Sequence, residues 1–180
     1  ERPRVMSARW QVMPPMSPNA PLTGAGYDQG VAQLLYNRGI TSPSEAQVFL
    51  SKEPVHHDPR LLPGIDQAVR RLSKAISHSE RIAIFGDFDV DGVTATALLT
   101  RGLKSLGVEV LAYIPHRVEE GHGLSMAAVE DLVSRGVDVL ITVDCGVTSY
   151  EEIDTAQGAG MDVIVTDHHL APEGAPNACA

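Results

Sequence analysis

The stretch IAIFGDFDVDG, residues 82–92, marks the point at which the sequence changes character, and the fold can be worked out from it. Its apolar start predicts a short buried strand over 82–85 that ends at Gly86 and Asp87. Apolar runs and helical periodicity then alternate. We expect strands over 108–114, 137–143 and 161–166, and helices over 94–106, 125–135 and 149–157. This order predicts an α/β domain in which helices cover both faces of a parallel sheet.

The sequence before this stretch predicts helices and no strands. Residues 1–26 are rich in proline and are expected to form an extended arm. Apolar spacing predicts helices over 27–40, 42–50 and 66–78, with a loop over 54–63. We therefore expect three parts: the arm over 1–26, a mainly helical region over 27–80 and the α/β domain over 81–180. His56 and His57 fall in the loop, and we interpret them as structural. Later in the chain, Ser149 and Glu152 fit a capping box at the start of the last helix.

The composition is that of a globular protein with unevenly spread charge. The chain has 180 residues, 43% of them hydrophobic, and a net charge of −9. Residues 1–81 sum to +3 and residues 82–180 to −12, which disfavours binding of nucleic acid by charge alone. No apolar run reaches the roughly 18 residues of a membrane span, so no membrane partner is expected. Two cysteines, Cys145 and Cys179, make no disulfide framework, which indicates a reducing, cytoplasmic setting.

Acids and histidines follow three of the four predicted strands. They are Asp87, Asp89 and Asp91 after the first strand, Asp144 after the third, and Asp167, His168 and His169 after the fourth. Because the carboxyl ends of parallel strands meet at one edge, we expect these side chains to lie close together. Such a cluster repels itself unless cations neutralise it. Carboxylates with imidazoles favour Mn²⁺ or Mg²⁺ over Zn²⁺, so the sequence predicts a metal site.

Each of these residues also has a plain structural explanation. An aspartate between a strand and a helix is often only the N-cap of that helix. An isolated His-His pair is more often a surface feature than a site, and the acidic stretch after the first strand fits an ordinary loop as well. Their shared position at the strand ends is what favours the metal site.

These motifs resemble those of the DHH phosphoesterase superfamily. Asp-His-His at 167–169 is similar to its namesake motif, GDFDVDGVT at 86–94 to its first motif and VDCG at 143–146 to its second. Within the superfamily the chain resembles the RecJ family of single-strand-specific 5′-to-3′ DNA exonucleases. That likeness also rests on LLYNRGI at 34–40, HDP at 57–59, YIPHR at 113–117 and EGHGL at 120–124, where tyrosine is commoner than His122.

The resemblance implies a role for each residue of the cluster. Asp89 and Asp91 would bind one metal ion each, Asp144 would bridge the two ions, and His168 would bind one of them. Asp87 would be either a ligand or a residue that holds a ligand in place.

The resemblance also implies the residues that meet the substrate. His169 would contact the scissile phosphate, so His169 and the bridging Asp144 are the implied catalytic residues. Asp167 would orient the two histidines without touching a metal. Many superfamily members have a histidine at the position of Phe85, so one metal would have fewer ligands here.

Arg117 is the residue outside the motifs that we expect to contact phosphate, because its planar guanidinium matches phosphate oxygens. The alternative is a surface ion pair with Glu119 or Glu120. Two cations about 3.5–4 Å apart hold a nonbridging oxygen, activate a water and stabilise the leaving oxygen of a phosphodiester.

The sequence therefore favours a metal-dependent phosphodiesterase that digests single-stranded DNA from its 5′ end in DNA repair and recombination, with Mn²⁺ or Mg²⁺ as cofactor. The resemblance implies single-stranded DNA and single-strand-binding protein as partners. The superfamily has a fourth acidic motif and a second domain beyond Asp-His-His. We therefore expect this chain to be the N-terminal part of a larger enzyme, with the C-terminal remainder as a further partner and little or no nuclease activity by itself.

Two other functions stay open at this point. The first is a superfamily phosphatase for short oligonucleotides, cyclic dinucleotides or pyrophosphate; such enzymes lack the helical N-terminal region and usually keep the histidine that Phe85 replaces. The second is a non-catalytic nucleic-acid-binding module of replication or repair. The complete set of Asp89, Asp91, Asp144 and His168 argues against a module that only binds.

Overall fold

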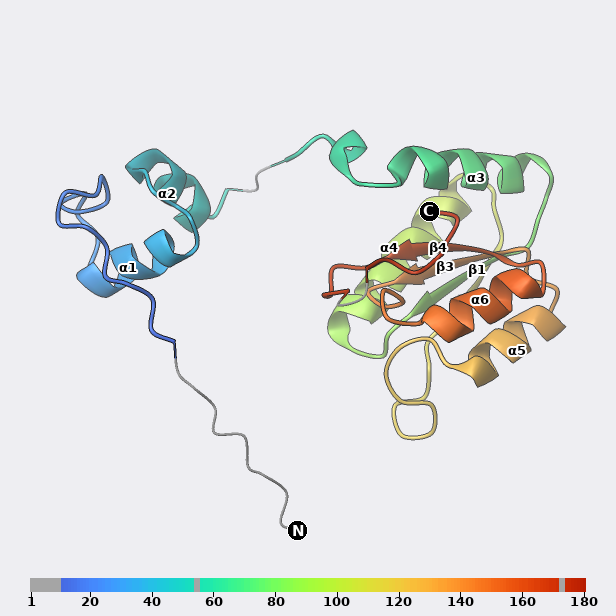
Figure 1. Cartoon of the computed structure of the whole chain (residues 1–180). Coiled ribbons are helices and arrows are strands. Elements are labelled where there is room, and N and C mark those ends of the chain that lie inside the picture. Colours follow the sequence, from blue (N-terminus) through green and yellow to red (C-terminus); the bar gives the residue numbers. More distant parts are fainter. Residues whose placement is uncertain (1–10, 54–55, 172–173) are drawn as a thin grey trace, which may run out of the picture. The chain divides into compact units, whose positions relative to one another are not determined.

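The computed structural model describes residues 11–53, 56–171 and 174–180, and the chain divides into two compact units at the His57–Asp58 junction (Figure 1). Each unit has its own buried core. Among the residues described, no helix combines the length and the apolar character that crossing a bilayer requires.

The first unit is built on two short helices, α1 (Gln29–Asn37) and α2 (Pro43–Leu50). Helix α2 begins with a capping box, in which the Ser42 hydroxyl accepts from the Glu45 backbone N–H and the Glu45 carboxylate accepts from the Ser42 N–H. The buried core of this unit consists of Leu22, Ala32, Leu35 and Ala46.

Residues 17–26 differ from the extended arm that their proline content predicts. They form successive turns, in which the Ala20 N–H donates to the Ser17 carbonyl and the Thr23 N–H to the Ala20 carbonyl. Leu22 is only 1% exposed, since it packs into the core of the first unit. The burial of this apolar side chain is the physical reason that the segment folds back.

The second unit contains a four-stranded, all-parallel sheet in the order β2-β1-β3-β4. The strands are β1 (Ile82–Gly86), β2 (Val110–Tyr113), β3 (Val139–Val143) and β4 (Asp162–Thr166). The two central strands, β1 and β3, are buried at every position. The predicted parallel sheet is confirmed, and three of its adjacent strands are those that end in the acidic motifs.

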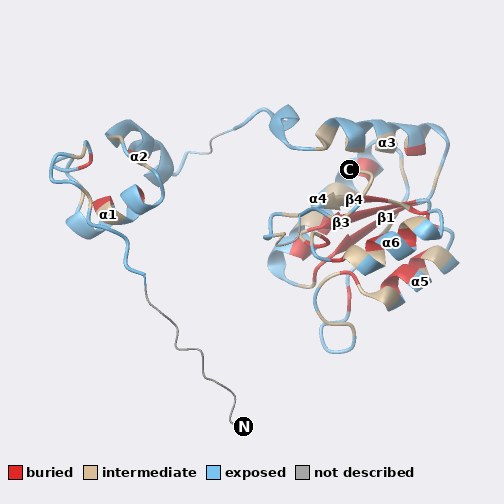
Figure 2. Cartoon of the chain, viewed as in Figure 1, coloured by how far each residue is buried: buried red, intermediate tan, exposed pale blue. Residues whose placement is uncertain are grey.

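Helices cover both faces of this sheet, as predicted (Figure 2). On one face lie α3 (Ile65–Ser77) and α4 (Val90–Ser105), which share a core with Ile82, Ile84 and Ile141. On the other face lie α5 (Met126–Ser134) and α6 (Tyr150–Gly158), which pack on Ala83, Phe85 and Leu140. The alternation of side chains along β1 therefore supplies both cores.

Helix α3 packs with the sheet, although the sequence grouped it with the N-terminal helical region. Ala75 is fully buried, and Leu72 and Ile76 pack against the same core as the sheet residues. A short 3₁₀ helix, Pro59–Leu61, precedes α3 in the second unit. The division between the units thus falls before α3 rather than after it, because the apolar face of α3 is buried on the sheet.

A pair of ionic contacts fixes α3 to the strands. The Arg71 guanidinium lies 2.6 Å from a Glu80 carboxylate oxygen and 2.5 Å from an Asp162 oxygen at the start of β4. We expect Arg71→Met to lower the free energy of unfolding by roughly 1–3 kcal/mol, because two carboxylates lose their partner. Urea denaturation followed by circular dichroism measures this. Arg70→Met, an exposed site on the same helix, is the control, and equal losses for both variants would contradict the argument.

The outer edge of β4 is covered by the last residues of the chain. The Cys179 N–H donates to the Val163 carbonyl and the Val165 N–H donates to the Ala180 carbonyl, each at 2.9 Å. These bonds satisfy backbone groups on the edge of the sheet.

Helix α6 does not begin with the capping box that the sequence predicts. Ser149 is the N-cap residue, but its φ of −90° and ψ of 58° are not extended, and its side chain makes no capping hydrogen bond. A cap hydroxyl reaches the N–H groups of the first turn from an extended backbone. The capping-box prediction for Ser149 and Glu152 is therefore wrong.

Candidate metal centre

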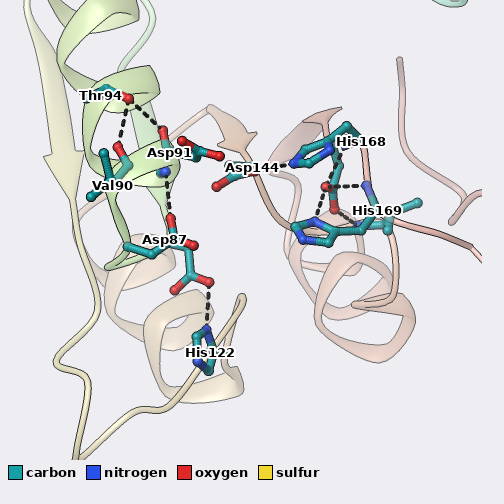
Figure 3. Close-up of polar contacts among 12 residues, drawn as sticks. Asp87, Val90, Asp91, Thr94, His122, Asp144, His168 and His169 are labelled. Carbon is teal, nitrogen blue, oxygen red and sulfur yellow. Dashed lines mark hydrogen bonds and ion pairs between the residues drawn. The ribbon is translucent and has the colours of Figure 1, made fainter. Parts of the chain in front are cut away.

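Three neighbouring strands, β1, β3 and β4, deliver acidic side chains to the carboxyl edge of the sheet (Figure 3). Asp87 follows β1, Asp144 follows β3 and Asp167 follows β4. Paired parallel strands end at the same edge of the sheet. Asp87 and Asp144, which are 57 positions apart in sequence, therefore come to the same edge as Asp167, which is 23 positions beyond Asp144.

The Asp-x-Asp-x-Asp motif spans the turn from β1 into α4. Helix α4 begins at Val90, earlier than the sequence predicts, because Asp89 serves as its N-cap and accepts from the Gly92 N–H at 3.0 Å. The expectation that this helix begins at Thr94 is wrong by one turn. Asp91 consequently lies in the first helical turn, where its carboxylate lines a pocket beside Asp144.

In this turn the backbone of Gly92, in the first turn of α4, lies in close contact with the backbone of Asp87 after β1. Gly92 packs directly on the backbone of Asp87, and a Cβ atom at Gly92 would come within 2.4 Å of the Asp87 carbonyl oxygen. Glycine is therefore required here by lack of space. The close approach sets the distance between the start of α4 and the end of β1, and so places the carboxylates of the motif.

Asp144 lies at the centre of the cluster. Its side chain is 8% exposed, its φ is +62°, and its N–H donates to the Thr166 carbonyl at 2.9 Å. The His168 Nε2 lies 3.0 Å from its Oδ1. Burial, followed by the negative charge of Asp89, raises the pKa of Asp144. A cation beside Asp144 would relieve both of these unfavourable effects.

Asp167 uses both of its oxygens to hold neighbouring groups. Oδ2 accepts from the Val147 N–H at 3.0 Å, while Oδ1 accepts from the His168 N–H at 2.7 Å and lies 2.7 Å from the His169 Nδ1. Burial acts to raise the pKa of Asp167, but these hydrogen bonds outweigh it and lower the pKa. The same contact with Asp167 raises the pKa of His169. Asp167 therefore orients the histidine motif.

One group of side chains in the described part of the chain is close enough to share an ion. Asp144, His168 and His169 each place one ligand atom within 4.8 Å of the others. Asp89 is adjacent, since its negative charge is among the causes that raise the pKa of Asp144. The hydrogen bond from the Gly92 N–H lowers the pKa of Asp89 itself. Asp87 instead faces His122, with its Oδ2 2.9 Å from the His122 Nδ1.

Two pockets meet at this cluster. The larger, of about 680 Å³, lies on the α4 side and is lined by Asp91, Thr94, Leu98 and His168 among others. The smaller, of about 210 Å³, lies on the α6 side. Asp144 and Asp167 line both, so the centre of the cluster is open to ligands from two directions.

The loop after β2 brings two more residues to the site. The Arg117 guanidinium lies over the Phe88 ring, 5.1 Å from its centroid, and the His122 ring lies 4.2 Å from the same ring. Sequence reasoning did not single out His122 as a site residue. Its one signal was its place in the EGHGL segment, because nothing in the local sequence shows that it faces Asp87.

The alternative role of Arg117 was an ion pair with a nearby glutamate. Glu120 is engaged elsewhere: it accepts from the Tyr113 hydroxyl at 2.7 Å and from the His116 N–H at 2.6 Å. Within the described residues, no ion pair joins Arg117 to Glu119 or Glu120. Arg117 is thus stacked beside the acidic motif with its N–H groups available.

The Tyr113–Glu120 contact yields a pH prediction. The hydrogen bond from Tyr113 to Glu120, aided by burial, raises the pKa of Tyr113 to about 12. We expect Glu120→Ala to bring the pKa of Tyr113 back toward about 10, so that the phenol ionises at lower pH. Absorbance at 295 nm during alkaline titration measures this, with Tyr113→Phe identifying the step. Glu119→Ala is the control, and an equal shift in both variants would contradict the assignment.

Phe85 lies away from the cluster. It is fully buried in the core between the sheet and helices α5 and α6, and its ring stacks on Tyr113 with 5.2 Å between centroids. Because side chains alternate along a strand, position 85 faces this core. It offers no ligand atom to the cluster.

The fold and the cluster together define an α/β protein with a carboxylate–histidine centre at the carboxyl edge of a parallel sheet. Residues 81–180 match the DHH family, N-terminal domain. The chain belongs to the DHH family.

Curated relatives are similar over the same region. The single-stranded-DNA-specific exonuclease RecJ of Bacillus subtilis is 41% identical over 140 residues, which cover 77% of this chain and 18% of the relative. The RecJ of Thermus thermophilus is 42% identical over 130 residues, covering 71% of this chain and 19% of the relative. The chain thus spans about a fifth of the length of these relatives.

Solved structures show the same likeness. An exonuclease RecJ bound to manganese is 40% identical, with a TM-score of 0.64, and the match covers 70% of this chain and 32% of that one. RecJ of Thermus thermophilus in complex with Mn²⁺ is 30% identical, with a TM-score of 0.61, and the match covers 89% of this chain and 22% of that one.

Proposed function

We propose that this chain forms the metal-binding part of a RecJ-like exonuclease, which hydrolyses phosphodiester bonds of single-stranded DNA from the 5′ end with Mn²⁺ or Mg²⁺. The observation that carries the proposal is the convergence of Asp144, His168 and His169 within 4.8 Å at the end of a parallel sheet. The likeness to manganese-bound RecJ structures supports it. A role in DNA repair and recombination, with single-strand-binding protein as a partner, belongs to the same proposal.

The donor atoms fit a hard or intermediate divalent cation. The cluster offers carboxylate and imidazole groups, whereas the adjacent Cys145 is buried, which raises the pKa of its thiol to about 12. Among the described residues no thiol joins the group of ligand atoms at the cluster, so a thiolate-bound zinc site is disfavoured. Asp89, Asp91, Asp144 and His168 would hold the metal, with Asp87 as a further ligand or as a support for one.

The metal, when bound, supplies charge neutralisation for the phosphodiester and a more acidic water. The chain's own residues bind and orient the substrate around it. Asp167 holds the His169 Nδ1 at 2.7 Å, so the opposite ring nitrogen is free to meet a phosphate oxygen. Arg117, stacked on Phe88, offers its planar N–H groups to the same anion.

Metal binding and substrate preference test the proposal together. We expect calorimetric titration with MnCl₂ to show binding by this chain. For the whole enzyme of which the chain is proposed to form a part, we expect Mn²⁺-dependent cleavage to be faster on a 5′-labelled single strand of thirty nucleotides than on its duplex or on a dinucleotide. Cleavage that favours the dinucleotide would support the short-oligonucleotide phosphatase instead. Mn²⁺ binding without hydrolysis of any substrate by the whole enzyme would support the non-catalytic module. Absence of Mn²⁺ binding would contradict the metal centre itself.

A further inference from the structure

The smaller pocket contains groups that the proposed metal centre leaves unused. It lies between the loop around His122 and the segment that joins β3 to α6. Besides the aspartates of the cluster, its lining includes His122, Gly123, Gly146, Thr148, Ser149 and His169. Since Asp144 lines this pocket as well as the larger one, a group bound here lies next to the metal-binding residues.

Ser149 is the most unusual residue of this pocket. It is only 8% exposed, it lines the pocket, and its hydroxyl neither caps α6 nor makes another hydrogen bond within the described part of the chain. A serine hydroxyl can donate one hydrogen bond and accept two, and none of these is used by the Ser149 side chain among the described residues. The hydroxyl is therefore available to a ligand in the pocket.

The N-terminus of α6 lies at the edge of the pocket, whose lining on this segment ends at Ser149. The first helical hydrogen bond runs from the Ile153 N–H to the Ser149 carbonyl, so the N–H groups of Tyr150, Glu151 and Glu152 have no helical acceptor. Unpaired N–H groups and the helix dipole favour an anion at this position. None of Tyr150, Glu151 and Glu152 lines the pocket, so their N–H groups act through the helix dipole and not as direct donors to a bound group.

Two histidines flank the pocket in matching arrangements. The His122 Nδ1 lies 2.9 Å from Asp87, and the His169 Nδ1 lies 2.7 Å from Asp167. An ionised carboxylate only accepts hydrogen bonds, so each Nδ1 carries the proton that it shares with its aspartate. The Nε2 atom of each ring is left free, and the two carboxylates are already satisfied.

We propose that this pocket binds a phosphate group of a nucleic-acid strand, held by the Ser149 hydroxyl and the His122 ring, next to the phosphate that His169 meets. The site rests on the proposed function, because it is the neighbouring position to a phosphodiester bound at Asp144. It would hold the phosphate adjacent to the scissile one and so fix the register of the strand. Position 122 is then a substrate-contacting residue that the motifs do not include.

Amide chemical shifts test this directly. We expect sodium phosphate, added to the ¹⁵N-labelled chain in MgCl₂, to shift the Ser149, Tyr150 and Glu151 amides saturably, with sodium chloride as the blank. The dinucleotide dTpdT should shift the same amides. Ser149→Ala should weaken the affinity by about 2- to 10-fold, the effect of one lost hydrogen bond. Ser73→Ala, an exposed site on α3, is the matched control.

The outcomes separate this proposal from the metal centre. If MgCl₂ shifts the Asp144 and His168 amides but phosphate leaves Ser149 and Tyr150 unmoved, the pocket proposal is overturned and the metal centre stands. If MgCl₂ shifts nothing and calorimetry shows no Mn²⁺ binding, the proposed function fails, whereas phosphate-induced shifts at Ser149 would still support the pocket. A response to inorganic phosphate but not to dTpdT would overturn the assignment to a strand. His122→Phe, which keeps an aromatic ring beside Phe88, should weaken phosphate binding.

Discussion

Asp144→Asn is expected to weaken Mn²⁺ binding by on the order of 100-fold or more and, in the whole enzyme, to reduce Mn²⁺-dependent phosphodiester hydrolysis to background. Asp144 is the carboxylate that both pockets share, and its neighbours are His168 and Asp89. Removing its charge takes away the anion that a cation at this position would neutralise. Calorimetric titration with MnCl₂ measures the affinity, and cleavage of a labelled single strand measures the activity.

Asparagine is the informative replacement because of the backbone at this position. Asp144 has a φ of +62°, a left-handed conformation that asparagine tolerates and alanine does not favour. The substitution therefore changes the charge while the fold is kept. Asp154→Asn, at an exposed position of α6, is the control and should bind Mn²⁺ as the wild type does. Unchanged Mn²⁺ affinity in Asp144→Asn would exclude Asp144 as a ligand.

Gly92→Ala is expected to lower the free energy of unfolding by about 3 kcal/mol or more, or to force the first motif apart. An added Cβ would lie 2.4 Å from the Asp87 carbonyl oxygen and 2.5 Å from the Asp87 nitrogen. These are backbone atoms between a buried strand and a helix, so neither side has room to move away. Urea denaturation followed by circular dichroism measures the loss, and Mn²⁺ titration shows whether the folded fraction keeps its site.

Gly102→Ala is the matched control on the same helix. A Cβ at Gly102 meets no atom within 4 Å, so the substitution adds no clash. Alanine is the better helix former, and we expect this variant to gain roughly 0.5–1 kcal/mol. If Gly92→Ala were as stable as Gly102→Ala, the close contact between α4 and the end of β1 would not exist in solution.

Much of the second unit could be predicted from local sequence patterns. The runs at 82–85 and 137–143 are too apolar for any place but the interior of a sheet, and both strands are buried at every position. Parallel pairing then follows from the helices between the strands, and it brings Asp87, Asp144 and Asp167 to one edge. That these residues lie close together could therefore be predicted without knowledge of side-chain contacts.

Other features could not be read from local patterns. Ser149 and Glu152 have the spacing of a capping box, yet the backbone at Ser149 is bent by the turn after Gly146, and no box forms. The amphipathic pattern of helix α3 predicts that one face of the helix is buried, but it does not predict against which unit that face packs. Local sequence patterns indicate the structure that a segment prefers in isolation. At these two places the tertiary contacts determine a different outcome.

The sequence by itself determined the order of elements, the parallel sheet and the identity of the acids and histidines at its edge, because these depend on periodicity and on which residue follows a strand. Only the tertiary structure decided how those side chains are paired. Asp167 is committed to His169, Asp144 faces His168, and Asp87 faces His122, 35 positions away in the chain. Such pairings depend on the path of a loop and on the backbone angle of single residues, neither of which leaves a repeating signal in the sequence.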